Sequence, residues 1–410
     1  MDTKTSGISS SSSFHIFLFL SFASIFIPTF GLSPGSYEFP AIFSFGDSNS
    51  DTGSMQAAFV RLNPPYGDTY FHKPAGRYSD GRLIVDFIAE ELKIGHVNAY
   101  LNSMGTNFTN GANFASGGAT IGLHSSILPY GVSSPFYLHL QFLQFEQFKL
   151  NSQFLSKQGG LFAELMPKEE YFSRALYMFD IGQNDIGVGL LTGKSIQEIN
   201  ASIPYIINQF SATVQNVYKS GGRSFWIFNI APLGCLPYVL VNFPSEKDEA
   251  GCALIYNQIA QYFNFKLNES IVQLRINYPL ATFVYVDIYS IKYSLFTSPQ
   301  QYGFEVPHVT CCGYGGIHNY SNEAPCGNRI EVNGEERVVD SCKDPSIRVV
   351  WDGIHFTEAA NKFVFNQISS GAFSHPPIPL KMSCTNVDEN HPSLMDEQFG
   401  QCGISHNVAF

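Results

Sequence analysis

The sequence carries little charge, and the charge it has is mostly acidic. Only 14% of its 410 residues are Asp, Glu, Lys or Arg, and 34 acidic residues outnumber 23 basic ones, for a formal net charge of −11. No basic run breaks this pattern. Proteins that bind nucleic acids need a basic surface to face the phosphates, so we expect no nucleic-acid partner.

The spacings typical of metal sites are also missing. The chain contains neither Cys-x-x-Cys nor His-Glu-x-x-His, so we expect no metal and no cofactor. No cysteine precedes residue 235, and the eight that follow are Cys235, Cys252, Cys311, Cys312, Cys326, Cys342, Cys384 and Cys402. An even number in an oxidising compartment predicts disulfides rather than a metal centre. The two pairs that we expect to close local loops are Cys235–Cys252 and Cys384–Cys402.

After the N-terminal region, no stretch is apolar and long enough to cross a membrane. The apolar run at 14–27 is short for a span, contains His15 and is followed by Pro28 and small residues. We therefore predict a signal peptide at 1–33 rather than a single-pass anchor, and no stable membrane insertion. Secretion also agrees with four Asn-x-Ser/Thr sequons, which we expect on exposed loops and which lie at Asn107, Asn200, Asn268 and Asn319.

The remaining chain alternates apolar strand-like runs with helical patterns. Strands are predicted at 41–43, 175–181, 225–230 and 282–288, and the helical stretches include 83–92, 202–219, 253–277 and 357–371. Continuous apolar strands separated by helices are typical of an α/β fold with a central parallel sheet and helices on both faces. The alternation spans most of the chain, which predicts one domain at 34–380.

Two segments interrupt this alternation. The pattern stops between residues 297 and 344, where Gly, Asn, Pro and four cysteines predict a long cross-linked loop without regular structure. Residues 242–251 form a second polar loop, and residues 381–410 form an irregular C-terminal tail.

Polar residues that could carry out chemistry follow the predicted strands. Gly46-Asp47-Ser48 comes directly after the first strand and precedes a predicted helix start, while Gly182-Gln-Asn184 follows another strand. Asp352 and His355 lie on a loop before the last helix. In a parallel sheet such loops meet at the carboxyl ends of the strands, where ligands bind. We therefore expect these side chains to lie close together.

These residue types are the components of an acyl-transfer site. A serine becomes nucleophilic when an imidazole takes its proton, and a carboxylate on the other ring nitrogen orients that imidazole. A serine at this place can also be only a helix N-cap, and Asp-x-x-His is common at helix starts. The Gly117-Gly118 turn, taken alone, can likewise be an ordinary turn.

Four blocks in order give these residues a common explanation. Gly46-Asp-Ser48, Asn113-Phe-Ala-Ser-Gly-Gly118, Gly182-Gln-Asn-Asp185 and Asp352-x-x-His355 resemble the blocks of the SGNH/GDSL esterase/lipase family. Stretches such as Cys312-Gly-Tyr-Gly-Gly316 are similar to its plant secreted branch, near the early-nodulin-like members. One departure is Asn49, where the family has Leu, and we expect this change to affect packing rather than chemistry.

The resemblance implies a fold, an activity and a site. It implies a flavodoxin-like, three-layer SGNH-hydrolase fold and a secreted serine esterase of the cell wall or apoplast, with an ester of a small molecule or polysaccharide as its substrate. Ser48 would be the nucleophile, His355 the base and Asp352 its partner. Gly117 and Asn184, with the Ser48 N–H, would form the oxyanion hole, although the spacing leaves Gly118 open as the donor.

Other functions remain open from the sequence. Lipases belong to the same family, some relatives are fucosidases, and a non-catalytic binding protein could retain the fold. A glycosidase needs two carboxylates across the sugar, for which Asp47, Asp185 and Asp352 are available. The polar, cross-linked segment at 297–344 favours a shallow hydrated site, and hence short acyl groups such as acetate on a sugar. The aromatic content, 15%, would suit either a sugar-binding surface or the core.

Overall fold

The computed structural model describes residues 39–59, 61–123 and 134–382, and all of them belong to one compact unit. The predicted signal peptide and the cysteines Cys384 and Cys402 lie outside these residues. No helix within the described ranges is long and apolar enough to cross a membrane. The strands are β1 Ile42–Gly46, β2 Gly111–Asn113, β3 Leu176–Asp180, β4 Ser224–Phe228, β5 Thr282–Val286, β6 Arg329–Val332, β7 Glu335–Val338 and β8 Ser374–His375. The helices are α1 Ser54–Ala58, α2 Ile84–Glu91, α3 Leu138–Gln158, α4 Leu161–Glu164, α5 Tyr171–Arg174, α6 Gln183–Leu191, α7 Ile196–Lys219, α8 Pro237–Asn242, α9 Leu254–Asn277, α10 Ile288–Thr297 and α11 Glu358–Ile368.

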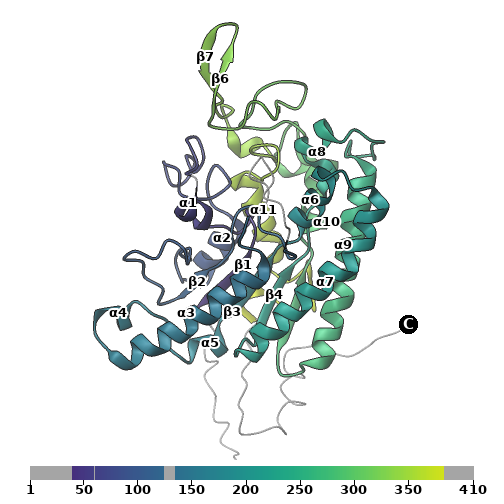
Figure 1. Cartoon of the computed structure of the whole chain (residues 1–410). Coiled ribbons are helices and arrows are strands. Elements are labelled where there is room, and N and C mark those ends of the chain that lie inside the picture. The colour runs from purple at the N-terminus through teal and green to yellow at the C-terminus, as the bar shows by residue number, and fades with distance from the viewer. Residues whose placement is uncertain (1–38, 60, 124–133, 383–410) are drawn as a thin grey trace, which may run out of the picture. The chain divides into compact units, whose positions relative to one another are not determined.

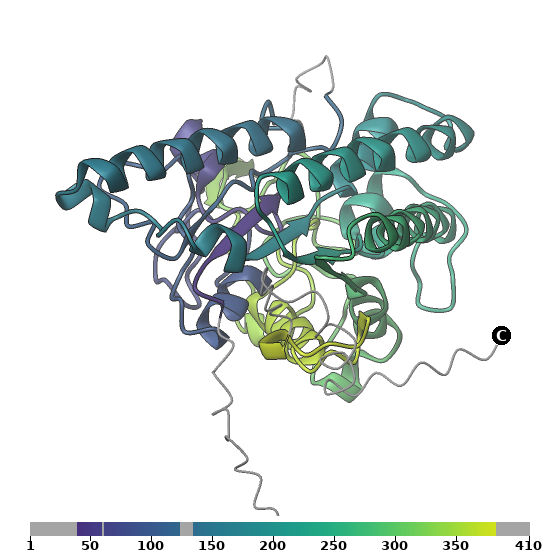
Figure 2. The same cartoon turned by 90° about the horizontal axis from the view of Figure 1, so that it is seen from below.

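Six strands form a sheet in the order β2-β1-β3-β4-β5-β8. The first five are parallel, and the two-residue β8 adds an antiparallel edge to β5. The order 2-1-3-4-5 is that of flavodoxin-like folds. Helices cover both faces, as Figure 2 shows with α3 and α7 on one side of the sheet and α11 on the other. The predicted three-layer α/β fold is confirmed.

Large aromatic side chains build one of the two core layers. Phe43, Tyr177, Phe225 and Phe283 occupy the same register position on four adjacent strands. Their ring centroids follow one another at 5.4, 5.6 and 4.7 Å across the sheet. Such aromatic pairs contribute about 0.5–1.5 kcal/mol each beyond the area they bury. Much of the high aromatic content therefore serves the core.

The long segment between α10 and α11 is cross-linked, as predicted, but it is not wholly irregular. Disulfides join Cys311 to Cys342 and Cys312 to Cys326, and β6 and β7 pair within the segment as a hairpin. Figure 1 shows this hairpin standing away from the sheet. The prediction missed it because the hairpin strands are short, charged and largely exposed.

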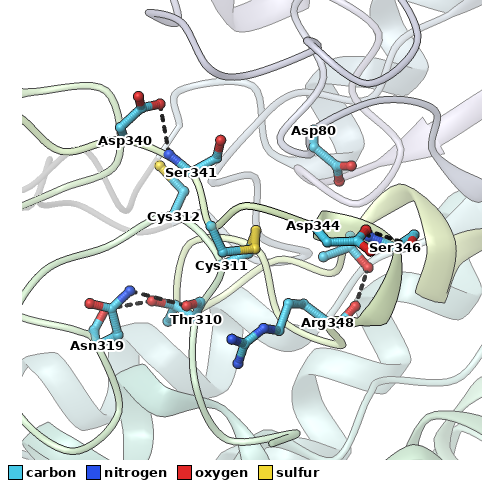
Figure 3. Close-up of a disulfide and its surroundings, with 12 residues drawn as sticks. Asp80, Thr310, Cys311, Cys312, Asn319, Asp340, Ser341, Asp344, Ser346 and Arg348 are labelled. Carbon is cyan, nitrogen blue, oxygen red and sulfur yellow. Dashed lines mark hydrogen bonds between the residues drawn. A yellow bond between two sulfur atoms is a disulfide. The ribbon is translucent and has the colours of Figure 1, made fainter. Parts of the chain in front are cut away.

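Two further sequence predictions can be compared with the structure. The Cys235–Cys252 disulfide is present, which confirms that pairing. The placement of the sequons is confirmed only in part, because Asn107 is exposed in a loop whereas Asn200 and Asn268 lie within α7 and α9. Asn319, in the cross-linked segment, is half-buried, and its amide donates to the Thr310 carbonyl at 3.2 Å beside the cysteine pair (Figure 3).

Gln141 of α3 fixes the end of β1, and hence the start of the loop that carries Ser48. Its carbonyl oxygen accepts from the Gly46 N–H at 2.9 Å, and its amide donates to the Gly46 carbonyl at 2.8 Å. The side chain is fully buried. These bonds satisfy Gly46 on the side of β1 that faces away from β3, where the pairing with β2 has already ended at Ser44.

Replacing Gln141 by leucine should destabilise the protein by about 2 kcal/mol, because the buried Gly46 N–H loses its partner. Urea unfolding measures this loss. Gln147→Leu on the exposed side of the same helix is the matched control and should leave the midpoint nearly unchanged. Equal midpoints for the two variants would contradict this account.

Candidate active site

Ser48, His355 and Asp352 form a continuous hydrogen-bonded chain. Ser48 Oγ lies 2.8 Å from His355 Nε2, and His355 Nδ1 lies 2.8 Å from Asp352 Oδ2. Because an ionised carboxylate only accepts, Nδ1 carries the proton and Nε2 accepts from the serine hydroxyl. Ser48 and His355 each expose 8% of their surface, so solvent can still reach the pair. The geometry is that of a serine activated by an oriented imidazole.

Ser48 lies in the turn after β1, and it is not a helix cap. The side chain of Asp51 accepts the N–H groups of Gly53, Ser54 and Met55 at 2.7, 2.6 and 3.1 Å, and α1 begins at Ser54. The expectation of a helix start directly behind Ser48 is therefore wrong. With Asp51 as acceptor for these N–H groups, α1 begins six residues after Ser48, and it is only five residues long.

Asp352 and His355 lie in a tight turn that is built by the cross-linked segment rather than by the sheet. Val350 and Phe356 pair across the turn as an isolated bridge, so the predicted strand-to-helix loop is wrong in detail. The adjacent N–H groups of Cys311 and Cys312 donate to the carbonyls of Val350 and Trp351 at 2.9 and 2.7 Å. The two disulfides thus hold the backbone on which the turn rests.

Thr357 ends this turn and begins α11. Its hydroxyl accepts from the Ala360 N–H as the helix N-cap, as the predicted helix start implied. This cap and the Trp351 N–H, which donates to the His355 carbonyl at 2.7 Å, fix the backbone on both sides of the imidazole. His355 therefore has little freedom to turn away from Ser48.

Sequence reasoning missed Tyr66, whose hydroxyl donates to Asp352 Oδ2 at 2.6 Å. Tyr66 is buried in a small core with Trp351 and the cysteines of the cross-linked segment. It follows Pro64-Pro65, a dipeptide that is typical of loops and indicates no function. No local pattern relates it to a carboxylate 286 residues away.

Hydrogen bonds and charge keep Asp352 ionised although it is buried. Burial by itself would raise its pKa, but the positive charge of His355 and hydrogen bonds from His355 and Tyr66 lower it from 3.8 to about 2. A carboxylate with a lowered pKa stabilises the fold above its ordinary pKa. We expect this contribution, about 2 kcal/mol, to be lost as the pH falls from about 4 towards 2.

Three blocks of the sequence meet beside Ser48. The Ser116 N–H donates to the Gly46 carbonyl at 3.1 Å, which places the glycine turn next to the end of β1. The Asn184 amide donates to the Ala119 carbonyl at 3.0 Å, which ties the start of α6 to the same turn. The expected meeting of these loops is therefore observed.

The two glycines of this turn differ in their hydrogen bonding. The Gly117 N–H donates to Asp51 Oδ2 at 2.8 Å, so it is already engaged. Among the described residues, the N–H groups of Gly118 and Ser48 have no hydrogen-bond partner. The donor expected at Gly117 thus points to Asp51, and Gly118 is the free donor.

Replacing Tyr66 by phenylalanine should raise the pKa of Asp352, because the carboxylate loses one charge-assisted hydrogen bond. Carboxyl carbon NMR titration of Asp352 measures the shift directly. The matched control is Tyr78→Phe, since the Tyr78 ring lies 5.0 Å from the His355 ring and no hydrogen bond joins its hydroxyl to Asp352 in the described structure. An unchanged Asp352 titration in Tyr66→Phe would rule out this role.

Comparisons with known proteins identify the family of this chain. Residues 42–368 match the model of the GDSL-like lipase/acylhydrolase family. The chain is 57% identical to an esterase of Hevea brasiliensis and 54% identical to the GDSL esterase/lipase ENOD8 of Medicago truncatula. These alignments cover 86% and 85% of this chain and 90% of each relative. It is also 46% identical to alpha-L-fucosidase 3 of Arabidopsis thaliana, over 83% of this chain and 94% of that protein. The chain therefore belongs to the GDSL-like lipase/acylhydrolase family of carboxylic ester hydrolases.

Proposed function

We propose that this protein is a secreted serine esterase in which Ser48 is the nucleophile, His355 the general base and Asp352 its orienting carboxylate. The observation that carries this proposal is the 2.8 Å contact between Ser48 Oγ and His355 Nε2, with Asp352 on the other ring nitrogen. Secretion is supported by the apolar N-terminal run and by three disulfides in the described part of the chain.

The reaction follows from the direction of the hydrogen bonds. Ser48 Oγ attacks the ester carbonyl carbon while its proton passes to His355 Nε2. His355 then gives this proton to the departing alkoxide, which leaves the acyl group on Ser48. Water attacks the acyl-enzyme by the same route, and the serine is restored. Asp352 stays ionised throughout and stabilises the imidazolium.

The developing oxyanion requires hydrogen-bond donors, and we assign this role to three groups. They are the N–H groups of Ser48 and Gly118 and the second amide hydrogen of Asn184, whose first hydrogen is bonded to Ala119. Gly118 takes the role first expected of Gly117, because Asp51 already accepts the Gly117 N–H. Each such donor contributes on the order of 3 kcal/mol in the transition state.

We further propose a short acyl group, such as acetate, on a sugar, polysaccharide or glycoside. Two tyrosines, whose rings end in a hydroxyl group, lie beside the Asp352–His355 turn. Tyr320 packs against Gly353, and the ring centroids of Tyr238 and Tyr320 are 6.2 Å apart. Rings of this kind stack on sugars and bind hydroxyl groups. No long apolar helix covers the turn in the described ranges, which does not favour a lipase acting on long chains.

The fucosidase name of one relative supports a second candidate, a glycosidase, but the carboxylates do not suit it. Asp352 is engaged by His355 and Tyr66, and Asp185 accepts the N–H groups of Ile121 and Gly122. Asp47 is fully buried. These three carboxylates therefore offer no exposed pair to flank a sugar bond. A non-catalytic binding protein is a third candidate, and it is disfavoured by the complete hydrogen-bonded triad.

Ser48→Ala and His355→Ala should each remove nearly all ester hydrolysis without unfolding the protein, since each removes a group that reacts. Steady-state kinetics measure the activity, and circular dichroism checks the fold. Turnover in Ser48→Ala near half that of the wild type would refute the nucleophile. Sugar release that survives labelling of Ser48 by an organophosphate would favour the glycosidase.

Asn184→Ala should lower kcat roughly a hundred-fold at nearly constant KM, because its amide acts mainly in the transition state. Steady-state kinetics and circular dichroism measure this effect as well.

The acyl preference can be tested with p-nitrophenyl esters from acetate to palmitate, alongside acetylated xylan. We expect kcat/KM to be highest for the acetyl esters. In an apolar groove each methylene would add somewhat under 1 kcal/mol of binding, so a lipase would show a steep rise towards octanoate. Such a rise would replace the short-acyl proposal by the lipase alternative.

A further inference from the structure

The side chain of Tyr78 lies between the two halves of the proposed site. Its ring centroid is 5.0 Å from that of the His355 ring, and the two ring planes are tilted by 33°. Its hydroxyl group lies against Gly117, because a Cβ added to that glycine would be 2.5 Å from the Tyr78 oxygen. One side chain therefore contacts both the imidazole and the glycine turn, and the reaction described above gives it no role.

The contact with Tyr78 explains why residue 117 is a glycine. The backbone of Gly117 is not in the left-handed region, unlike that of Gly118, whose φ is 73°. Another residue could adopt this conformation, but the space is taken, since the added Cβ would also lie 2.7 Å from two carbons of the Tyr78 ring. A glycine of this kind lets another group approach the backbone closely. Here that group is a phenol.

The Tyr78 hydroxyl is free to donate a hydrogen bond. Within the described ranges it has no hydrogen-bond partner, whereas the hydroxyl of the neighbouring Tyr66 is bonded to Asp352. The side chain of Tyr78 is half-buried rather than sealed in the core. Burial and the negative charges of Asp51 and Asp352 raise the pKa of Tyr78. The phenol therefore keeps its proton throughout the pH range in which a histidine acts as a base.

The chain is anchored on both sides of Tyr78. The buried Arg77 before it forms an ion pair with Asp86 at 2.8 Å. The Ser79 hydroxyl after it donates to the carbonyl of Phe356 at 3.0 Å, one residue beyond the histidine of the triad. A donor that is held in place does not have to be reoriented when charge develops on the substrate, and this is what makes such donors effective.

We propose that the Tyr78 hydroxyl is a further catalytic donor to the oxyanion, beside the N–H groups of Ser48 and Gly118. This inference rests on the proposed function. The hydroxyl lies against the Cα atom of Gly117, which belongs to the same peptide unit as the Gly118 N–H, so both donors face one place. No proton leaves Tyr78, because its O–H bond stays intact while the Ser48 proton passes to His355.

Tyr78→Phe tests this proposal, because phenylalanine keeps the ring against His355 and removes only the hydroxyl. We expect kcat for p-nitrophenyl acetate to fall about ten- to a hundred-fold at nearly constant KM, since the remaining donors still act. The matched control is Tyr100→Phe. Among the described residues the Tyr100 hydroxyl also has no hydrogen-bond partner, but its ring lies 5.2 Å from that of Phe114. The kcat of this control should equal that of the wild type.

A second ester distinguishes the oxyanion from the departing oxygen. Ethyl acetate and p-nitrophenyl acetate form the same kind of oxyanion, but ethoxide is much the poorer leaving group. If Tyr78 donates to the oxyanion, Tyr78→Phe should lower kcat/KM by similar factors for both esters. A loss confined to ethyl acetate would place the hydroxyl at the leaving oxygen and overturn the assignment.

Labelling of Ser48 by diisopropyl fluorophosphate, followed by mass spectrometry, requires no ester. The phosphoryl oxygen takes the place of the oxyanion, so labelling should slow by a similar factor in Tyr78→Phe and stay unchanged in Tyr100→Phe. Equal labelling rates in Tyr78→Phe and the wild type would overturn the inference and leave the proposed function intact. If the wild type is labelled but hydrolyses no ester, the proposed function fails, and the labelling rates still decide the role of Tyr78. A wild type without label at Ser48 would overturn both.

Discussion

The contact between the ends of β1 and β3 is the constraint on which the site depends. Gly46 lies against Asp180 so closely that an added Cβ would be 2.4 Å from the Asp180 carbonyl oxygen. That carbonyl accepts the Asp47 N–H at 3.0 Å, so the chain turns immediately after the strand and presents Ser48. Only glycine permits this approach. Besides burial, the negative charge of Asp180 is one cause of the raised pKa of Asp47. The position of the serine and the buried charge behind it have the same origin.

The other half of the proposed triad depends on covalent cross-links rather than on the sheet. The Asp352–His355 turn belongs to no strand of the sheet, and its backbone is held by the N–H groups of Cys311 and Cys312. Cross-linking restricts the unfolded chain and stabilises a loop that has few regular hydrogen bonds of its own. Tyr66, packed in the same cluster, completes the carboxylate. The segment that interrupts the α/β alternation is thus a support for the base.

Stability and chemistry oppose each other around Ser48. Asp352 is ionised because hydrogen bonds and His355 outweigh its burial, so its charge contributes to stability. Asp47 shows the reverse balance, because burial and a like charge disfavour its ionised form. The two carboxylates therefore titrate in different pH ranges, and perturbed pKa values of this kind are common at functional sites.

The sequence by itself predicted the layers and singled out the residues of the proposed triad, because the period of apolar residues and the order of the four blocks can be read along the chain. Tertiary structure decided what depends on distances between loops. The Tyr66–Asp352 bond joins residues 286 apart, and Asp51 rather than spacing distinguishes Gly117 from Gly118. No pattern in the sequence singles out Lys292, and only the packing of α10 brings its ammonium to 4.1 Å from the ring centroid of Phe356, next to His355. Contacts between loops depend on the order of the strands in the sheet, and no local sequence pattern encodes them.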